Sequence, residues 1–370
     1  MHKNSKSINQ KIGILTYHFP YNCGAMLQAY ALQKALNEKC DCEIIDYAPD
    51  YHTKAFVPKI RNYIHPDNTK NPLNIIKGIY GYYKDNCHLI KRNNEQFQKK
   101  LKKSKRIKTE EALKAAEKNY DKIIVGSDQI WRKFKNYHFE YFLNFDEENP
   151  KKYSYAASTG SCFEPEDMPI VKNLLSDFRF VSVREKALAD QLSEFGIPCR
   201  VDIDPTLLLK KEDYTKLEKC VKTNGRFIFV YLCRDDRALN VIKYLSEKFE
   251  AEVIFGPFTG FKADIDFKYR FCDYFGPQEF LYCIHHASFV VTSSFHCTVF
   301  SILYNTPFVV LDKIGKFERI KNLLEFTKLE SHRFVSLDSI DFNSNYENAR
   351  NTISSLAQTS YNYLEEIVDD

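Results

Sequence analysis

Short apolar segments alternate with helical segments in two successive series, and this feature constrains the fold more than any other. The first series has apolar segments at 11–17, 43–47, 122–125, 152–158, 180–183 and 199–203, with helical segments at 25–36 and 185–195. The second has apolar segments at 227–232, 252–255, 289–292 and 307–311, with helical segments at 237–249, 277–286 and 295–304. Such alternation builds parallel sheets with helices on both faces. The sequence therefore predicts an α/β protein with two doubly wound lobes.

The length of 370 residues suits two domains of about 100–200 residues each. We place the first lobe at 1–205, because the first series ends near Asp204 and Pro205, and the second at 206–370. The segment at about 60–118 interrupts the alternation, and we expect it to be a basic helical insertion in the first lobe.

A dense basic run lies inside this insertion, from Lys99 to Lys108. Its cations are Lys99, Lys100, Lys102, Lys103, Lys105, Arg106 and Lys108. We favour a solvated surface, since charge runs are commonly exposed helix. The alternative is peripheral contact with an anionic membrane or an acidic acceptor, where each cation near a membrane surface adds about 1 kcal/mol.

Composition excludes several classes of function. The net charge of +4, from 53 basic and 49 acidic residues, gives no global field that favours nucleic acid. No apolar run approaches the roughly 20 residues of a membrane span, and 1–10 lacks the apolar segment of a secretory signal. We therefore expect a cytoplasmic protein, with any membrane contact peripheral and at the inner face.

The eleven cysteines are odd in number and scattered, which favours reduced thiols over disulfides. Two groups were weighed as zinc sites: Cys40 with Cys42, and Cys272 with Cys283, His285 and His286. Neither has the paired two-residue spacing of a zinc knuckle. We expect no metal site.

The stretch 289–300 carries the strongest signal for a ligand site. An apolar strand ends at Thr292, and Ser293 and Ser294 precede a helix whose first turn contains Phe295 and His296. Free N–H groups and the helix dipole at such a start favour an anion by about 0.3–2 kcal/mol. Alternatively, the two serines only cap the helix and His296 bonds to a neighbouring carbonyl.

Arg184 follows directly on another apolar strand and opens a helix. Its guanidinium is a planar fork of donors that matches a carboxylate or a phosphate. The alternative is a pair with Glu185 or another surface acid. Ligands bind beyond the carboxyl ends of strands in doubly wound sheets, so this position favours a ligand role.

Two further strand ends carry small or polar residues. Asn22 and Gly24 precede the first helix, and Gly126, Ser127 and Asp128 follow the third strand. Glycine there would let backbone approach a ligand closely. Glycine turns at strand ends are also frequent for purely conformational reasons.

The chain resembles the polysaccharide pyruvyltransferase family in six blocks that occur in the same order. They are Tyr21–Leu32 (YNCGAMLQAYAL), Val125–Trp131 (VGSDQIW), Tyr155–Ser158 (YAAS), Ser182–Glu185 (SVRE), Asp204–Leu209 (DPTLLL) and Thr292–His296 (TSSFH). The resemblance extends from Ile12 to about Leu324, which is nearly the whole chain. The joint occurrence of these blocks is far more specific than any one of them.

The resemblance implies a GT-B-like fold, with two Rossmann-like lobes facing a central cleft. It implies transfer of the pyruvyl group of phosphoenolpyruvate to a sugar diol as a cyclic ketal, in the synthesis of a polysaccharide or glycan such as an exopolysaccharide or capsule. Phosphoenolpyruvate is then the donor substrate, no cofactor is needed, and the acceptor is a glycan or a lipid-linked sugar.

By the same resemblance, Arg184 and His296 bind the donor, and His296 is a candidate acid. Asp128 or Asp204 is a candidate base on the acceptor. Many members have an arginine where Ser294 stands here, and a leucine in place of Phe295. Arg319 is a candidate substitute for that arginine, or an exposed helix residue.

Three other functions stay open at this point. The two-lobed fold also serves nucleotide-sugar glycosyltransferases, and fold does not fix function. A non-catalytic relative that binds a glycan or phospho-ligand would account for the departure at Ser294. A cysteine hydrolase built on Cys23 or Cys297 has the least support, because neither thiol can be paired with a base in the sequence.

Overall fold

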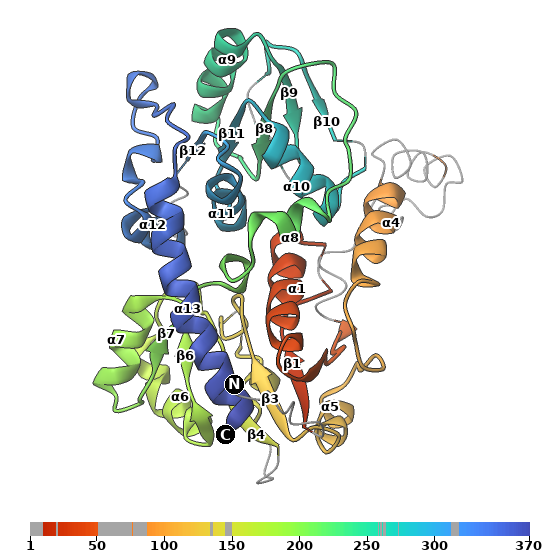
Figure 1. The fold of residues 1–370 in the computed structure, drawn as a ribbon, viewed down its shortest axis with the longest axis vertical. Helices are drawn as coiled ribbons and strands as arrows, with labels where there is room; N and C mark the ends of the chain where they lie inside the picture. Colours follow the sequence, from red (N-terminus) through yellow and green to blue (C-terminus); the bar gives the residue numbers. More distant parts are fainter. Residues whose placement is uncertain are drawn as a thin grey trace, which may run out of the picture.

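The computed structural model describes residues 10–50 except 20, residue 76, residues 87–144 except 134 and 135, residues 150–311 except 258, 260, 262, 263 and 273, and residues 318–370. These residues form an α/β structure with two five-stranded sheets, whose strand pairs are all parallel. The sheets occupy the lower and upper halves of the molecule in Figure 1. Of the predicted insertion, 60–75 and 77–86 lie outside the described residues.

The first sheet has the strand order of a flavodoxin-type doubly wound sheet. Across the sheet its strands are β2 (Asp41–Ile44), β1 (Lys11–Leu15), β3 (Lys122–Val125), β4 (Lys151–Ser154) and β5 (Phe178–Phe180). Its helices are α1 (Cys23–Asn37), α4 (Cys87–Gln98), α5 (Glu110–Glu117), α6 (Met168–Leu175) and α7 (Lys186–Glu194). A short pair, β6 (Ser182–Val183) and β7 (Arg200–Val201), joins the sheet through a bridge between Ala157 and Val183.

The second sheet has the Rossmann strand order, in which the strand that comes first in sequence within that sheet lies in the middle. Across the sheet its strands are β10 (Tyr269–Phe271), β9 (Glu252–Phe255), β8 (Phe227–Tyr231), β11 (Phe289–Thr292) and β12 (Phe308–Val310). Its helices are α9 (Arg237–Phe249), α10 (Pro277–His286), α11 (Phe295–Tyr304) and α12 (Glu318–Thr327), and α8 (Lys211–Thr215) precedes it. The predicted GT-B-like α/β fold with two doubly wound lobes is confirmed, although only the second lobe has the Rossmann order.

One apolar cluster connects the two lobes, and alternate strand residues show how it forms. In β8, Phe229 faces a cluster that also contains Ile14 of β1, Leu27 of α1 and Phe280 of α10. Its neighbour Val230 faces the opposite side, in the cluster under α9. Because each buried Phe or Leu side chain contributes about 1.5–3 kcal/mol, this shared cluster holds the two sheets in one body.

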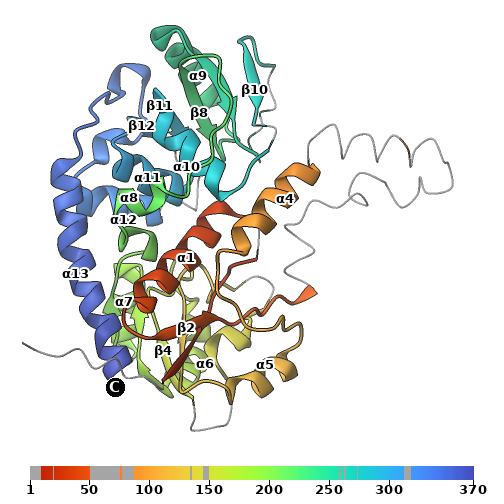
Figure 2. The same ribbon diagram turned by 45° about the vertical axis from the view of Figure 1, so that its right-hand side comes forward.

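The C-terminal helix α13 (Glu347–Asp369) runs from the second lobe down onto the first (Figures 1 and 2). The buried Lys122 Nζ donates to the carbonyls of Ile367 and Val368 at 2.8 and 2.7 Å. The Tyr363 hydroxyl donates to the Ser154 carbonyl at 2.7 Å. The predicted domain boundary between residues 205 and 206 stays a prediction. It places α13 in the second lobe, although α13 packs on the first sheet. Helical periodicity marks an apolar face without naming its partner.

The basic run at 99–108 is extended beside β2, so the expectation of a helix is wrong for this part of the insertion. Backbone bonds join Ile44 to Lys102 and Ser104, each at 2.9 Å. Lys102 pairs with Asp41, and Lys103 and Arg106 pair with Asp46 at 3.7 and 3.2 Å. Three of the seven cations thus pair with two carboxylates of the first lobe, and membrane contact through this run stays a prediction.

No helix in the described ranges is both long enough and apolar enough to cross a membrane.

Candidate functional site

A pocket of about 330 Å³ lies where strand ends of the first lobe face α11 and α12 of the second. Residues from both lobes line it, including Arg184, Glu185, Asp204, Phe295, Arg319 and Asn322. Residues of α13, among them Leu356 and Ser360, also line it. Of the predicted site residues, Arg184, Asp204, Phe295 and Arg319 line this pocket, whereas His296, Ser293, Ser294, Asn22 and Gly24 do not.

Arg184 is held in place by two carboxylates. Its Nη1 donates to Asp204 Oδ2 at 2.6 Å, and its Nε donates to Glu185 Oε1 at 3.3 Å. Burial by itself would lower the pKa of the guanidinium, but Glu185, Asp204 and Asp128 together raise it above its usual range. The buried Nη2 has no hydrogen-bond partner in the described parts of the chain. Arg184 is thus a permanent cation with one donor group left over.

Asp204 uses both of its oxygens. Oδ1 accepts from the amide and the hydroxyl of Thr206 at 3.0 and 2.6 Å, and Oδ2 accepts from Arg184. Burial would raise the pKa of this carboxyl, but His296 and Arg184 hold it well below its usual range. So acidic a carboxyl is a weak base, and the geometry makes Asp204 a positioning residue for Arg184.

His296 lies in the first turn of α11, where backbone N–H groups outnumber the acceptors available to them. Ser294 caps the helix, because its Oγ accepts from the Cys297 N–H at 3.4 Å. The N–H groups of Phe295 and His296 have no acceptor within the helix. His296 Nε2 is buried without a hydrogen-bond partner in the described structure and lies 3.6 Å from Asp204 Oδ2, beyond hydrogen-bond distance.

The start of α1 meets the start of α11 at Gly24. Asn22 caps α1, accepting from the N–H groups of Gly24 and Ala25 at 3.1 and 3.4 Å. A Cβ at Gly24 would lie 2.1 Å from His296 Nδ1. The sequence suggested that this glycine admits a ligand, but the group that it admits is the His296 ring. A ligand contact by Asn22 or Gly24 stays a prediction.

The residues that follow the third strand contact neighbouring backbone and do not line the pocket. A Cβ at Gly126, whose φ is +120°, would lie 2.3 Å from the Tyr155 carbonyl oxygen. The buried Ser127 Oγ donates to the Ala156 carbonyl at 3.1 Å. None of Gly126, Ser127 and Asp128 lines the pocket. Asp128 nevertheless stands close enough for its charge to act on Arg184.

Arg319, at the start of α12, brings a second cation to the pocket. The guanidinium carbons of Arg184 and Arg319 lie 4.9 and 5.8 Å from the centre of the Phe295 ring. Burial lowers the pKa of Arg319, and the charge of Arg184 lowers it further against the opposing effect of the nearby acids. Within the described ranges it forms no ion pair. An anion between the two guanidiniums would relieve their repulsion.

A model of the polysaccharide pyruvyl transferase family matches residues 22–312 of this sequence, which is more than half of the chain. The chain belongs to this family. The match spans all of the blocks identified above except the residue before Asn22, and it includes Arg184 and His296. The predicted family is thereby confirmed.

Solved structures show a distant likeness to this member of the polysaccharide pyruvyl transferase family. A UDP-N-acetylglucosamine 2-epimerase from Rickettsia bellii has 10% identity and a TM-score of 0.49, over 98% of this chain and 97% of its own. One from Methanocaldococcus jannaschii has 14% and 0.48, over 93% and 91%. Anabaena HepE, in complex with UDP and glucose, has 11% and 0.49, over 98% and 100%. The curated proteins compared with the chain gave no match.

Two polar residues inside the family blocks were not singled out in the sequence for the site. Glu185, which had been weighed only as a competing partner of Arg184, orients that arginine, and the Ser158 hydroxyl donates to the same Glu185 oxygen at 2.7 Å. Thr206 does the equivalent for Asp204. Glu185 lies next to Arg184, and Thr206 lies two residues after Asp204. Closeness in the sequence to a predicted site residue is the signal that could have identified both.

The remaining polar candidates have structural partners. The Ser293 hydroxyl donates to the Leu311 carbonyl at 2.8 Å and so joins the ends of β11 and β12. Cys23 and Cys297 are both buried, and burial raises the pKa of both thiols. A protonated thiol is a poor nucleophile, so the geometry gives a cysteine hydrolase no support.

Proposed function

We propose that this member of the polysaccharide pyruvyl transferase family transfers the pyruvyl group of phosphoenolpyruvate to a sugar diol, forming a cyclic ketal. One observation supports the donor above all: two arginines line one pocket without full partners, since Arg184 Nη2 makes no hydrogen bond and Arg319 makes no ion pair among the described residues. His296 Nε2, also without a hydrogen-bond partner there, lies 3.6 Å from Asp204 of the pocket. Phosphoenolpyruvate carries roughly −2.5 to −3 charges near neutrality, on a phosphate and a carboxylate. A pocket of about 330 Å³ is of the size that small-molecule sites have.

The reaction that these groups support has two stages. In the first, an acid donates a proton to the methylene carbon of phosphoenolpyruvate, and a sugar hydroxyl oxygen bonds to the adjacent carbon while losing its proton to a base. In the second, phosphate departs with the electrons of its bond to that carbon. A second hydroxyl of the sugar then adds and loses its proton, which gives the ketal and inorganic phosphate.

Each residue near the pocket has a proposed part in this scheme. Arg184 binds an anionic group of the donor through Nη2, the one donor group that Asp204 and Glu185 leave free, and Arg319 neutralises the other. His296 supplies or relays the proton, because an imidazole gains and loses a proton near neutral pH. Asp204 positions Arg184, which leaves Asp128 as the candidate base on the acceptor. The acceptor is a glycan, free or lipid-linked.

Ligand-dependent unfolding tests the donor. Phosphoenolpyruvate at a hundred times its dissociation constant should stabilise the protein by about 2.7 kcal/mol, and equimolar inorganic phosphate should stabilise it less. Phosphate release with a panel of free and lipid-linked glycosides then tests turnover. Stabilisation by a UDP-sugar and none by phosphoenolpyruvate would make the chain a glycosyltransferase. Stabilisation by phosphoenolpyruvate without release on any acceptor would favour a binding protein.

A further inference from the structure

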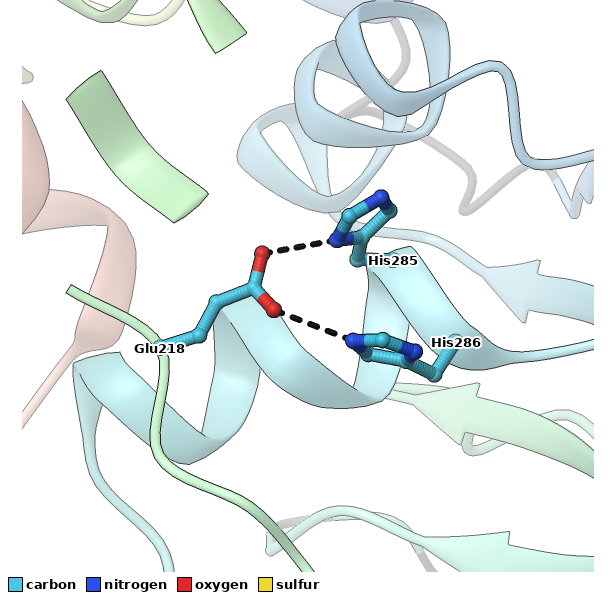
Figure 3. Close-up of side chains that lie close together, drawn as sticks. All are labelled: Glu218, His285 and His286. Carbon is cyan, nitrogen blue, oxygen red and sulfur yellow. Dashed lines mark hydrogen bonds and ion pairs between the residues drawn. The ribbon is translucent and has the colours of Figure 1, made fainter. Parts of the chain in front are cut away.

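Outside the pocket, Glu218 faces two consecutive histidines at the end of α10 (Figure 3). Its Oε1 lies 2.8 Å from His285 Nδ1, and its Oε2 lies 3.1 Å from His286 Nε2. The three candidate ligand atoms all lie within 4.8 Å of one another. Two imidazole nitrogens and one carboxylate therefore converge on one point near the surface.

Ring stacking holds both histidines toward Glu218. The His286 ring stacks on Tyr282 at 4.2 Å, and the His285 ring stacks on Tyr304 at 4.3 Å with only 14° between the planes. The side chain of His286 is 45% exposed, whereas that of Glu218 is 9% exposed. The group is thus preorganised on its inner side and open to solvent on its outer side.

The donor set fits a particular class of ion. Two imidazole nitrogens and one carboxylate suit Zn²⁺ and other first-row divalent ions, and three protein ligands leave a position for water. Ca²⁺ and Mg²⁺ prefer oxygen ligands throughout. In the sequence these histidines were weighed with Cys272 and Cys283, but both thiols are buried in the core, away from solvent.

Glu218 belongs to the segment that connects the lobes, between α8 and β8. That segment already follows α10: the Lys219 N–H donates to the Gln278 carbonyl at 3.2 Å, and Gln278 Nε2 donates to the Leu217 carbonyl at 2.6 Å. These bonds lie at the N-terminal end of α10, and the two histidines lie at its C-terminal end. The Glu218 side chain already reaches the two histidines, so an ion bound there would strengthen a second attachment of the connecting segment to this helix.

We propose that Glu218, His285 and His286 bind a divalent ion of the zinc type, which fixes the connecting segment to α10. In the metal-free protein, each imidazole directs one nitrogen at the carboxylate. Because an ionised carboxylate only accepts, each of those nitrogens carries a proton in the metal-free protein. On binding, each gives that proton to solvent while the other nitrogen of the neutral ring takes one up, and the freed lone pair coordinates the ion. Binding to neutral imidazoles needs no redox partner and releases no net proton from the rings.

Cobalt(II) is the probe, because its visible spectrum reports its ligands. The full-length, tag-free protein in a reducing buffer without thiols should take up one equivalent of Co²⁺, without the intense near-ultraviolet band of a cobalt–thiolate bond, and Zn²⁺ should displace it. Glu218→Gln and His286→Asn should each weaken binding by at least about 10–100-fold, the size seen even for outer-shell substitutions. His138→Asn, a histidine outside the group, is the matched control and should bind normally.

Other outcomes would overturn the proposal. Absence of binding, a thiolate band, or equal affinity in wild type, Glu218→Gln and His286→Asn would each remove the site. Circular dichroism establishes that the variants are folded. Limited proteolysis tests the connecting segment: Zn²⁺ should slow cleavage within 216–226 in the wild type and not in His286→Asn. Cleavage that ignores bound Zn²⁺ would overturn the structural part. None of these readouts depends on pyruvyl transfer.

Discussion

The two sides of the pocket use their polar groups in opposite ways. On the first-lobe side, Arg184 is braced by Asp204 and Glu185, and Asp204 is braced in turn by Thr206. On the second-lobe side, His296 Nε2 is buried without a hydrogen-bond partner in the described structure, and Asp204 Oδ2 lies 3.6 Å from it. A buried donor without an acceptor costs about 1–3 kcal/mol, which a bound anion would recover. The first-lobe side therefore holds its cation in place with bonds of its own and leaves only Arg184 Nη2 for a ligand, whereas His296 Nε2 on the second-lobe side makes no hydrogen bond in the described structure.

This contrast separates stability from function. Substitutions on the first-lobe side should reduce the free energy of unfolding, because they break bonds that the free protein already has. Substitutions on the second-lobe side should reduce binding or turnover and leave folding nearly unchanged. Each of the following predictions tests one side against the other.

The largest effect is expected for His296→Gln. Glutamine keeps hydrogen-bonding capacity in a similar volume but cannot titrate, so phosphoenolpyruvate should still bind while turnover falls by about 10²–10⁴-fold. The free energy of unfolding should change little. Phosphate release at saturating phosphoenolpyruvate and urea unfolding are the two measurements. Near-normal turnover would mean that His296 only positions the anion.

His18 supplies the matched control for that substitution. It is a fully buried histidine of the first lobe, with Nε2 2.9 Å from Asp46 Oδ1 and Nδ1 3.0 Å from the Thr16 carbonyl. His18→Gln should lose stability, and its activity should fall only in step with the folded fraction. The same pattern in His296→Gln would make His296 a core residue.

Arg184→Ala should lower the free energy of unfolding by about 3–5 kcal/mol, because Asp204 and Glu185 would stay buried without their counter-charge. Urea unfolding in the absence of ligand measures this. Arg184→Lys keeps the charge but loses the fork, so it should be more stable than Arg184→Ala and still impaired in turnover. Wild-type stability in Arg184→Ala would break the contrast between the two sides, and full activity would remove Arg184 from the site.

Arg319→Ala should weaken phosphoenolpyruvate binding by about 10–100-fold, since a charge-assisted hydrogen bond contributes about 1.5–3 kcal/mol. Stability should be unchanged or slightly higher, because burial and the charge of Arg184 both disfavour this cation in the free protein. Isothermal titration calorimetry measures the affinity. Lys321→Ala is the control: Lys321 lies on the same helix and pairs only with Glu318 and Glu325 among the described residues. A loss of stability at unchanged affinity would make Arg319 a structural residue.

The sequence predicted the second lobe more closely than the first, for a physical reason. The observed bounds of β9, β11, α9, α10 and α11 are those predicted, since apolar runs, a helix-starting Pro277 and the Ser294 cap are local signals. The basic run of the first lobe was misjudged. It is extended because it bonds to β2, and that partner lies about 60 residues away in the chain.

The site shows the same limit. Arg184 and His296 could be found because Arg184 directly follows a buried strand and His296 lies in the first turn of the helix after one, positions that sequence alone marks. The contact between Gly24 and the His296 ring could not be predicted, since the two residues belong to different lobes. Glu218 was missed for the same reason, because 67 residues separate it from His285. Local patterns identify which residues carry chemistry, and the tertiary structure decides which of them meet.

The smallest effects belong to Ser294, and they show whether Arg319 replaces the arginine that many family members have at this position. Ser294→Ala removes the cap of α11 and should cost about 1 kcal/mol of stability, with little change in affinity for phosphoenolpyruvate. Ser294→Arg loses the same cap but adds a cation beside the pocket. If Arg319 supplies the missing charge, the double variant Ser294→Arg/Arg319→Ala should recover most of the affinity that Arg319→Ala loses. Ser294→Gln/Arg319→Ala, which adds length without charge, should not. Calorimetry on Arg319→Ala, Ser294→Arg and the two double variants measures these affinities. Equal affinities in the two double variants would mean that charge at position 294 cannot replace Arg319. The second-lobe side would then act through the placement of its donors rather than through its charge.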